Sequence, residues 1–96
     1  MDRSRALELL ATSKPVLRER FGVVDLALFG STLHGTARPD SDVDVLVRFD
    51  GAATSQRYFG VQFFLEDLFG VPVDLVTDKA LRSELRPIIE REAVHV

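Results

Sequence analysis

The sequence predicts a small α/β (α+β) domain in which about three strands are covered by helices. Short apolar runs alternate along the chain with longer stretches whose apolar residues recur at helical spacing. Glycine or proline separates most of these segments, as is typical of chain reversals. Because 96 residues can bury one modest core and little more, we expect a single domain over residues 1–96.

The first third of the chain predicts a helical region followed by a strand. Residues 3–21 carry apolar side chains at helical spacing. Ser13 stands two residues before Pro15, which is typical of a new helix start, so we expect two short helices or one helix with a break. Gly22 is placed to end this region. Residues 23–29 form a short apolar run beside glycines, which predicts a buried strand.

The middle of the chain predicts a turn, a loop and a second strand. Residues 31–35 indicate a short helical turn. Residues 36–41 indicate a loop, because the proline that follows Arg38 keeps that residue out of the helical region. Residues 42–49 alternate between a face of valines and phenylalanine and a face that carries two aspartates and an arginine, which predicts a strand.

The remaining chain predicts a helix, a third strand and a last helical region. Residues 55–69 form a phenylalanine-rich helix that Gly70 closes. Its apolar side chains lie on more than one face of the helix. They therefore either all pack in the core or leave some of their number as a protein-binding surface. Residues 72–77 form the third strand. Asp78 can cap the last helical region, within which Pro87 marks a joint.

Composition narrows the class of protein. The net charge of −3 argues against a nucleic-acid-binding surface, which would be basic. The absence of cysteine excludes disulfides, zinc–thiolate sites and thiol nucleophiles. The first residues are charged where a signal peptide needs an apolar run, and no stretch approaches the ~20 apolar residues of a membrane span. We therefore expect no membrane association and a cytoplasmic location, with His95 in a frayed C-terminal segment.

Three aspartates are candidate metal ligands. Asp42 and Asp44 share one face of a strand, where their oxygens can hold one cation or bridge two. Asp74 lies between apolar residues of the third strand, and a carboxylate buried there would need a partner. Oxygen ligands without a neighbouring imidazole or thiolate suit Mg²⁺, with Mn²⁺ also possible. Asp74 bonded only to backbone, or a solvated pair of strand aspartates, is the alternative interpretation.

A glycine-serine pair is the candidate phosphate-binding element. Gly30 ends the first strand, where the missing side chain lets another group approach the backbone. Ser31 begins a helical turn, so its hydroxyl and the free N–H groups of that turn suit an anion. Arg38 is placed to reach the same phosphates. The chain therefore combines a nucleoside triphosphate site with a two-ion carboxylate site.

These parts predict metal-assisted nucleotidyl transfer. Two cations bind the triphosphate; one activates an attacking hydroxyl and the other stabilises the leaving pyrophosphate. Two other chemistries fit the residues poorly. A calcium-binding loop starting at Asp40 would need glycine and glutamate where Val45 and Gly51 stand. Ser31 and His34 lack the glycine-flanked elbow of a serine hydrolase, so His34 is interpreted as a polar residue of the turn.

The motif resembles that of the polymerase-beta-type nucleotidyltransferase superfamily. Gly30 and Ser31, then ten residues, then Asp42-Val-Asp44, and later Val-Asp74-Leu-Val, follow its pattern without a departure. The small size and the run Ala-Arg-Pro-Asp-Ser-Asp-Val-Asp-Val-Leu-Val are more narrowly similar to its minimal nucleotidyltransferases. The resemblance covers nearly the whole chain. It implies the nucleotidyltransferase fold, a small mixed sheet with helices packed on it.

The resemblance also implies an activity and a partner. By motif matching, Gly30 and Ser31 correspond to the phosphate-contacting pair, and Asp42, Asp44 and Asp74 to the metal-binding triad. Minimal nucleotidyltransferases typically act as antitoxins that transfer AMP from ATP to a tyrosine of a HEPN-domain ribonuclease toxin. An antitoxin that neutralises by binding alone, and a nucleotidyltransferase acting on a small molecule, are the two alternatives. The latter usually needs an added helical domain, which these residues do not provide.

Overall fold

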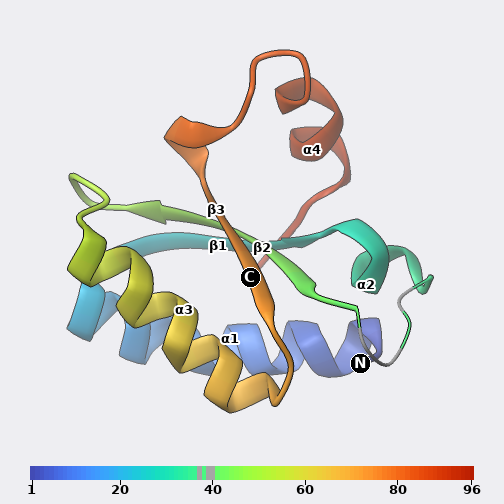
Figure 1. Cartoon of the computed structure of the whole chain (residues 1–96), viewed down its shortest axis with the longest axis horizontal. Helices are drawn as coiled ribbons and strands as arrows, with labels where there is room; N and C mark the ends of the chain where they lie inside the picture. Colours follow the sequence, from blue (N-terminus) through green and yellow to red (C-terminus); the bar gives the residue numbers. More distant parts are fainter. Residues whose placement is uncertain (37, 39–40) are drawn as a thin grey trace.

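The computed structural model describes residues 1–36, 38 and 41–96, in which helices pack on a mixed sheet (Figure 1). The helices are α1 (Arg3–Phe21), α2 (Gly30–His34), α3 (Ser55–Phe69) and α4 (Arg86–Glu92), with a 3-10 turn η1 (Asp78–Ala80). The strands are β1 (Val23–Phe29), β2 (Val43–Phe49), β3 (Val73–Thr77) and β4 (Val94–His95). None of the described helices is both long and apolar enough to cross a lipid bilayer. The α/β class is confirmed.

The sheet has the order β3-β2-β1-β4. β2 runs parallel to β3, whereas β1 is antiparallel to both β2 and β4, so the sheet is mixed as the resemblance implied. The fourth strand was not predicted, because two residues carry no periodic signal. It pairs with Ala27 and Leu28, and His95 lies 2.8 Å from a carboxylate oxygen of Asp25. The expectation of a frayed C-terminus was therefore wrong.

One continuous helix, α1, replaces the two helices or broken helix that the sequence predicted. The Asp2 carboxylate caps its start by accepting a bond from the Arg5 N–H, at 2.8 Å. Ser13 is buried inside the helix, and its hydroxyl donates to the carbonyl of Leu10 rather than capping a new one. Pro15 is an exposed residue within the helix. Burial of the helix on both sides of the proline outweighs the lost hydrogen bond.

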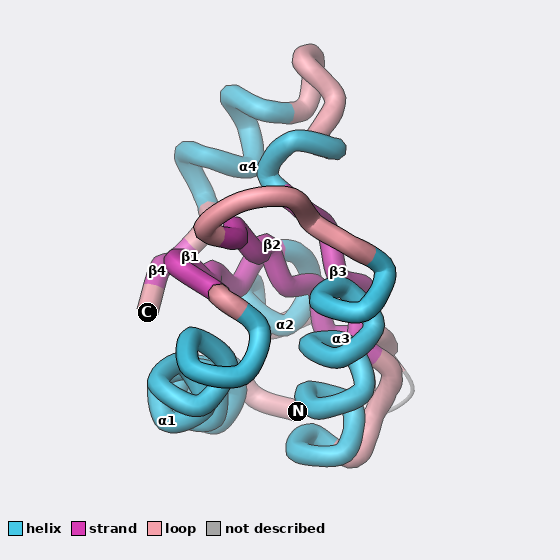
Figure 2. The backbone as a smooth tube through the Cα atoms, turned by 90° about the vertical axis from the view of Figure 1, so that its left-hand side faces the viewer, coloured by secondary structure: helices cyan, strands magenta, loops and turns pink. Residues whose placement is uncertain are grey.

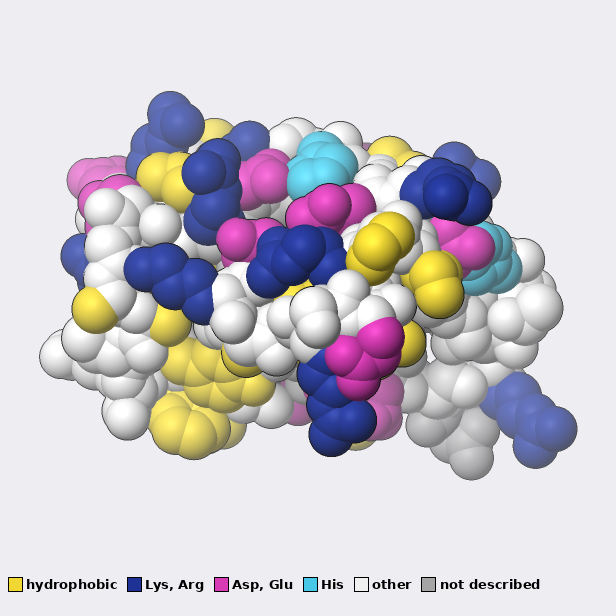
Figure 3. Space-filling model, turned by 90° about the horizontal axis from the view of Figure 1, so that it is seen from above, with side chains coloured by type: hydrophobic (Ala, Val, Ile, Leu, Met, Phe, Trp, Pro, Cys, Tyr) yellow, Lys and Arg dark blue, Asp and Glu magenta, His cyan; other side chains and the backbone are white. Residues whose placement is uncertain are grey.

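The two faces of the sheet are covered unequally. α1 and α3 cover one face side by side (Figures 1 and 2) and bury the main core there, including the valines of β2, as the alternation predicted. The opposite face carries a smaller cluster around Ala27, Leu46 and Leu81, beneath the segment that contains α4. Seen from the α4 side, charged and histidine side chains are spread over the surface among apolar and other groups (Figure 3). We call this less covered face the open face.

Helix α3 also protects the free edge of the sheet at β3. The Tyr58 hydroxyl donates to the carbonyl of Leu75 at 2.5 Å, and the Gln62 amide donates to the carbonyl of Val73 at 3.2 Å. The Glu66 carboxylate accepts from the Val73 N–H at 2.9 Å. These side chains, spaced four residues apart, occupy backbone groups that would otherwise template another strand. The edge is therefore blocked to β-pairing along its first half.

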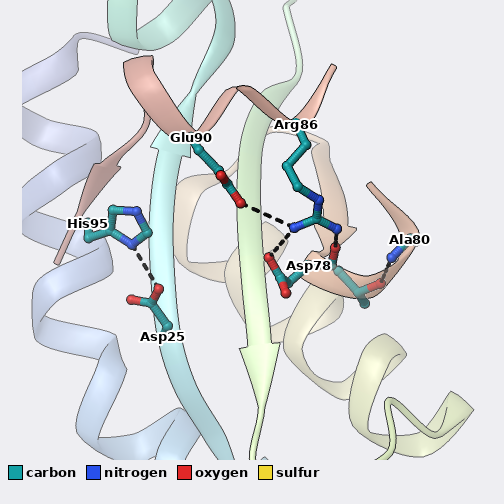
Figure 4. A network of polar contacts seen from close by, with 7 residues as sticks. Asp25, Asp78, Ala80, Arg86, Glu90 and His95 are labelled. Carbon is teal, nitrogen blue, oxygen red and sulfur yellow. Dashed lines mark hydrogen bonds and ion pairs between the residues drawn. The ribbon is translucent and has the colours of Figure 1, made fainter. Parts of the chain in front are cut away.

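A polar network holds the C-terminal segment on the sheet (Figure 4). Arg86 donates to the Asp78 carboxylate at 3.1 Å, to the Asp78 carbonyl at 2.8 Å and to Glu90 at 3.2 Å. The N-cap of η1 is Thr77, whose hydroxyl accepts from the Ala80 N–H, so the prediction that Asp78 caps this region was wrong. Asp78 instead fixes α4 through Arg86. Pro87 lies in the first turn of α4, which confirms the predicted joint.

The glycines that end α1 and α3 predict a measurable difference in stability. Gly22 and Gly70 both have φ of 72°. An added Cβ would meet nothing within 4 Å at Gly70 but would lie 2.7 Å from the Asp50 carboxylate at Gly22. Gly70→Ala should therefore cost about 1 kcal/mol from the left-handed backbone alone. Gly22→Ala should cost somewhat more, because the Asp50 carboxylate and the Arg57 guanidinium bound to it must shift to make room. Urea unfolding midpoints measure both, and equal losses would contradict the steric argument.

Candidate active site

Strand directions bring the candidate residues to one end of the sheet. β1 ends at Phe29, where β2 and β3 begin, because β1 is antiparallel to β2 and β2 is parallel to β3. Phe29 lies opposite Asp44, and Asp44 lies opposite Asp74. The glycine-serine pair follows directly on β1. Segments far apart in the sequence therefore place a turn and three aspartates side by side.

Gly30 is required by both its backbone and its neighbour. Its φ of 76° lies in the left-handed region that favours glycine. A Cβ on this residue would overlap the carboxylate of Asp44. The sequence predicted that a group approaches the backbone here, and in the structure Asp44 is one that does. The turn and the strand can meet this closely only because residue 30 has no side chain.

Ser31 joins the turn to the aspartates through its backbone. Its N–H donates to the carboxylate of Asp44, and that hydrogen bond lowers the pKa of Asp44. Its carbonyl accepts from the Thr36 N–H at 3.0 Å, which closes the turn. The side chain is half-buried at the start of α2. Ser31 thus contacts Asp44 through its backbone N–H.

The charge of Asp44 is disfavoured by its surroundings. Burial, the neighbouring charge of Asp74, a hydrogen bond to Asp74 and the charge of Asp42 together raise its pKa to about 6. Asp42 and Asp74 are both exposed, so the expectation that Asp74 is a buried carboxylate was wrong. Its side chain leaves the sheet on the open face beside Asp44. Repulsion among the three aspartates, rather than burial of Asp74, is therefore the evidence that these carboxylates need a compensating positive charge.

This donor set fits a hard divalent cation. Asp44 and Asp74 face each other closely enough to share a hydrogen bond, and Asp42 adds a third negative charge. Among the described residues, no three acidic, histidine or cysteine side chains are already grouped to hold a metal. The two exposed side chains can turn toward Asp44, since solvent surrounds them. Converging carboxylates repel one another until a cation neutralises them, which fits Mg²⁺ or Mn²⁺.

Arg38 is the basic residue that the sequence placed near the phosphates, and Arg57 and Lys79 are two further basic side chains whose positions can be compared with it. Arg38 is exposed in the loop before β2, and the described contacts of this residue are backbone bonds with Ser41. Arg57 is bound to Asp50 at 2.7 Å, beyond the opposite end of β2 from Asp44. Lys79 lies in η1, after the end of β3. Arg57 and Lys79 are therefore remote from the aspartates, and the structure does not bring the Arg38 side chain to them.

Tyr58 is a neighbour of the site that the sequence did not single out. Burial and the charge of Asp74 both raise the pKa of its hydroxyl. The sequence signal that could have identified it is the four-residue spacing of Tyr58, Gln62 and Glu66, which places the three polar side chains in one row along α3. His34, interpreted as a residue of the turn, ends α2 and lies 3.1 Å from Glu92. It therefore links α2 to α4.

A family model described as a nucleotidyltransferase domain matches residues 10–96. The chain belongs to this family. The protein adenylyltransferase MntA of Thermococcus cleftensis is 41% identical over 88 residues, which cover 92% of this chain and 89% of that protein. The chain is accordingly an enzyme of the nucleotidyltransferase class, as the motif indicated.

Solved structures agree on the fold. One that is provisionally described as a minimal nucleotidyltransferase matches with a TM-score of 0.77 at 38% identity, covering 98% of this chain and 95% of that chain. A chain from the complex of tri-AMPylated Shewanella oneidensis HEPN toxin with MNT antitoxin matches with a TM-score of 0.68. It is 16% identical, and the match covers 94% of this chain and 70% of that chain. At that identity the likeness concerns the fold alone.

The raised pKa of Asp44 predicts a pH-dependent stability. An unfolded aspartate titrates near ~3.9, so the folded state binds this proton more tightly. The stabilising contribution is complete below about pH 4 and is lost as the pH rises through about 6. Asp44→Asn should therefore stabilise the metal-free protein by about 1 kcal/mol at pH 8, after allowance for solvent screening. It should have little effect at pH 4.

Thermal unfolding at both pH values in EDTA measures this difference. Asp67→Asn is the matched control, because this exposed carboxylate on α3 lies outside the cluster. A destabilising effect of Asp44→Asn at pH 8 would contradict the repulsion inferred among the three aspartates.

Proposed function

We propose that this protein transfers AMP from ATP to a tyrosine hydroxyl of a HEPN-domain ribonuclease toxin and acts as its antitoxin. The observation that carries the proposal is the meeting of the Gly30-Ser31 turn with Asp42, Asp44 and Asp74 at one end of an open sheet face. A protein acceptor is supported by the name of the Thermococcus relative and by the AMPylated toxin in the Shewanella complex.

The phosphate chain of ATP is assigned to the turn. The Ser31 hydroxyl and the N–H groups that begin α2 can donate to phosphate oxygens, and Gly30 keeps the approach free of a side chain. The exposed Arg38 side chain is proposed to neutralise the same oxygens. The nucleotide then lies over the open face, with its α-phosphate toward the aspartates.

The aspartates are assigned to two divalent ions, Mg²⁺ by preference and Mn²⁺ as an alternative. Asp42 and Asp44 would hold both ions, and Asp74 would hold the ion nearest the acceptor. Bound ions supply a Lewis acid for the phosphates and lower the pKa of the attacking hydroxyl. Asp74, which is exposed at the edge of the sheet, would accept the hydroxyl proton as the new P–O bond forms and pyrophosphate leaves.

The first experiment is intact-mass spectrometry. The purified protein is mixed with Mg²⁺, ATP and the HEPN-domain protein encoded by the neighbouring gene. We expect the partner to gain one or more AMP units, and peptide mapping to place them on tyrosine. Asp42→Ala combined with Asp44→Ala should abolish the gain, as should EDTA. A partner whose mass stays unchanged with each of the four nucleoside triphosphates, while the complex forms, would contradict the transferase proposal.

Neutralisation by binding alone is the second candidate, favoured by the exposed side chains of Phe59 and Phe63. The Asp42→Ala, Asp44→Ala protein separates the two. If transfer protects cells, the variant should bind the toxin yet fail to neutralise it, with activity lowered by roughly 10³-fold or more. Full neutralisation by this variant would establish occlusion instead. Transfer to a small molecule instead of the toxin would leave the partner's mass unchanged while ATP is consumed.

Asp74 allows a sharper test of the proposed base. Asp74→Asn keeps the size of the side chain but removes its charge, so AMP transfer should fall about 10²–10⁴-fold, as for loss of a general base or a metal ligand. Because Asp74 also raises the pKa of Tyr58, a spectroscopic titration of this single tyrosine should show a lower pKa in the variant. Glu19→Gln, which removes an exposed charge on α1, serves as the control, and equal activity of both variants would remove Asp74 from the site.

A further inference from the structure

Two phenylalanines on α3 are exposed although the helix already has a buried face. Phe59 is 48% exposed and Phe63 is 60% exposed. Their rings stack with centroids 6.1 Å apart, and Tyr58 meets Phe59 edge-on at 5.2 Å. We call Tyr58, Phe59 and Phe63 the aromatic stripe. The core-facing residues of α3 are others: Val61, Leu65 and Phe69.

The stripe lies next to the edge of the sheet that carries Asp74. α3 turns its core-facing side to the sheet and its polar row of Tyr58, Gln62 and Glu66 to the β3 edge. By helical geometry Phe59 and Phe63 follow that row on the side away from the core. Tyr58 belongs to both the polar row and the aromatic stripe. Its hydroxyl donates to the carbonyl of Leu75, the residue after Asp74, and the charge of Asp74 raises the pKa of that hydroxyl. The stripe is thus continuous with the candidate active site.

The charges toward the C-terminal end of the stripe and the β3 edge are acidic, whereas Arg57, before the stripe, is paired with Asp50. The exposed Asp67 lies one turn beyond Phe63 on α3, and with Glu66 it lines a shallow groove of about 430 Å³ that continues to Pro72. Asp74 adds a carboxylate on the side of the active site. An apolar centre with an acidic rim is complementary to a protein surface that has an apolar side chain among Lys or Arg. The same charges repel the phosphates of a nucleic acid.

We propose that the aromatic stripe is the docking surface for the acceptor protein, and that the acceptor presents an apolar patch bordered by basic side chains. The inference rests on the proposed function, because the acceptor of AMP transfer is the occupant. Docking beside Asp74 would deliver an acceptor hydroxyl to the open face without a dedicated domain for the second substrate. Aromatic side chains in such a position typically provide much of the binding energy of an interface.

The test is the affinity between the purified chain and the HEPN-domain protein of the neighbouring gene, measured by isothermal titration calorimetry. Phe59→Ser combined with Phe63→Ser should weaken binding at least tenfold and lower AMP transfer at subsaturating partner. Phe59→Leu combined with Phe63→Leu should retain most of the affinity, because it keeps an apolar surface. Asp67→Lys should weaken binding, and the loss should shrink at high salt.

Matched controls exclude a general loss of structure. Leu68→Ser and Val16→Ser remove apolar side chains that are 40% and 37% exposed outside the stripe, and both should bind the partner normally. The serine double variant should retain its unfolding temperature within a few degrees, and Mg²⁺-ATP should stabilise it as it stabilises the wild type. These readouts show that the fold and the nucleotide site survive the substitutions.

Each remaining outcome separates the two proposals. Wild-type affinity in the serine double variant would overturn the docking surface and leave AMP transfer standing. A complex that depends on the stripe, but in which no AMP is transferred, would overturn the transferase and leave the surface standing. A wild-type dimer that the double variant converts to a monomer would reassign the stripe to self-association and overturn the inference. Absence of a complex would overturn the docking surface, and the transferase would fall with it only if the partner also gained no AMP.

Discussion

The register of β2 between its two neighbours is the constraint on which the site depends. Asp44 lies opposite Phe29 on one side and Asp74 on the other, so one strand joins the turn to the edge of the sheet. Because side chains alternate, a slip of one residue would send the aspartates into the core and the valines to the open face. The buried valines of β2 forbid that slip. The packing of the valines in the core therefore determines that the aspartates of β2 lie on the open face.

The residues of the candidate site lower the stability of the folded protein. Asp44 is partly buried against two like charges, and Gly30 holds a backbone conformation that other residues rarely adopt. Neither feature helps folding, and both are confined to strand ends and the turn between them. The main core lies on the opposite face beneath α1 and α3. This separation allows carboxylates to repel each other in a small domain without disrupting its packing.

The sequence predicted most of the regular structure, because periodicity and spacing are local signals, and it singled out the glycine-serine pair and the aspartates that the structure brings together. Its errors arose where distant contacts decide. Packing keeps α1 continuous through Pro15, and pairing with β1 orders the chain around His95. Asp74 was expected to be buried from its apolar neighbours, but alternation in β3 places them on the other face. The side-chain position of Arg38 depends on a loop that no sequence pattern determines.

The edge position of β3 explains why an acceptor should approach from the side of α3. An edge strand is open to any extended segment, and pairing there would compete with productive docking beside Asp74. Tyr58, Gln62 and Glu66 occupy the edge with side chains, so a partner must bind through its own side chains. The surface that α3 offers to such a partner, next to that polar row, is aromatic. Helix α3 thus has three functions on three of its faces. One face packs on the sheet, the polar row blocks strand addition at β3, and the aromatic stripe is left for binding the acceptor.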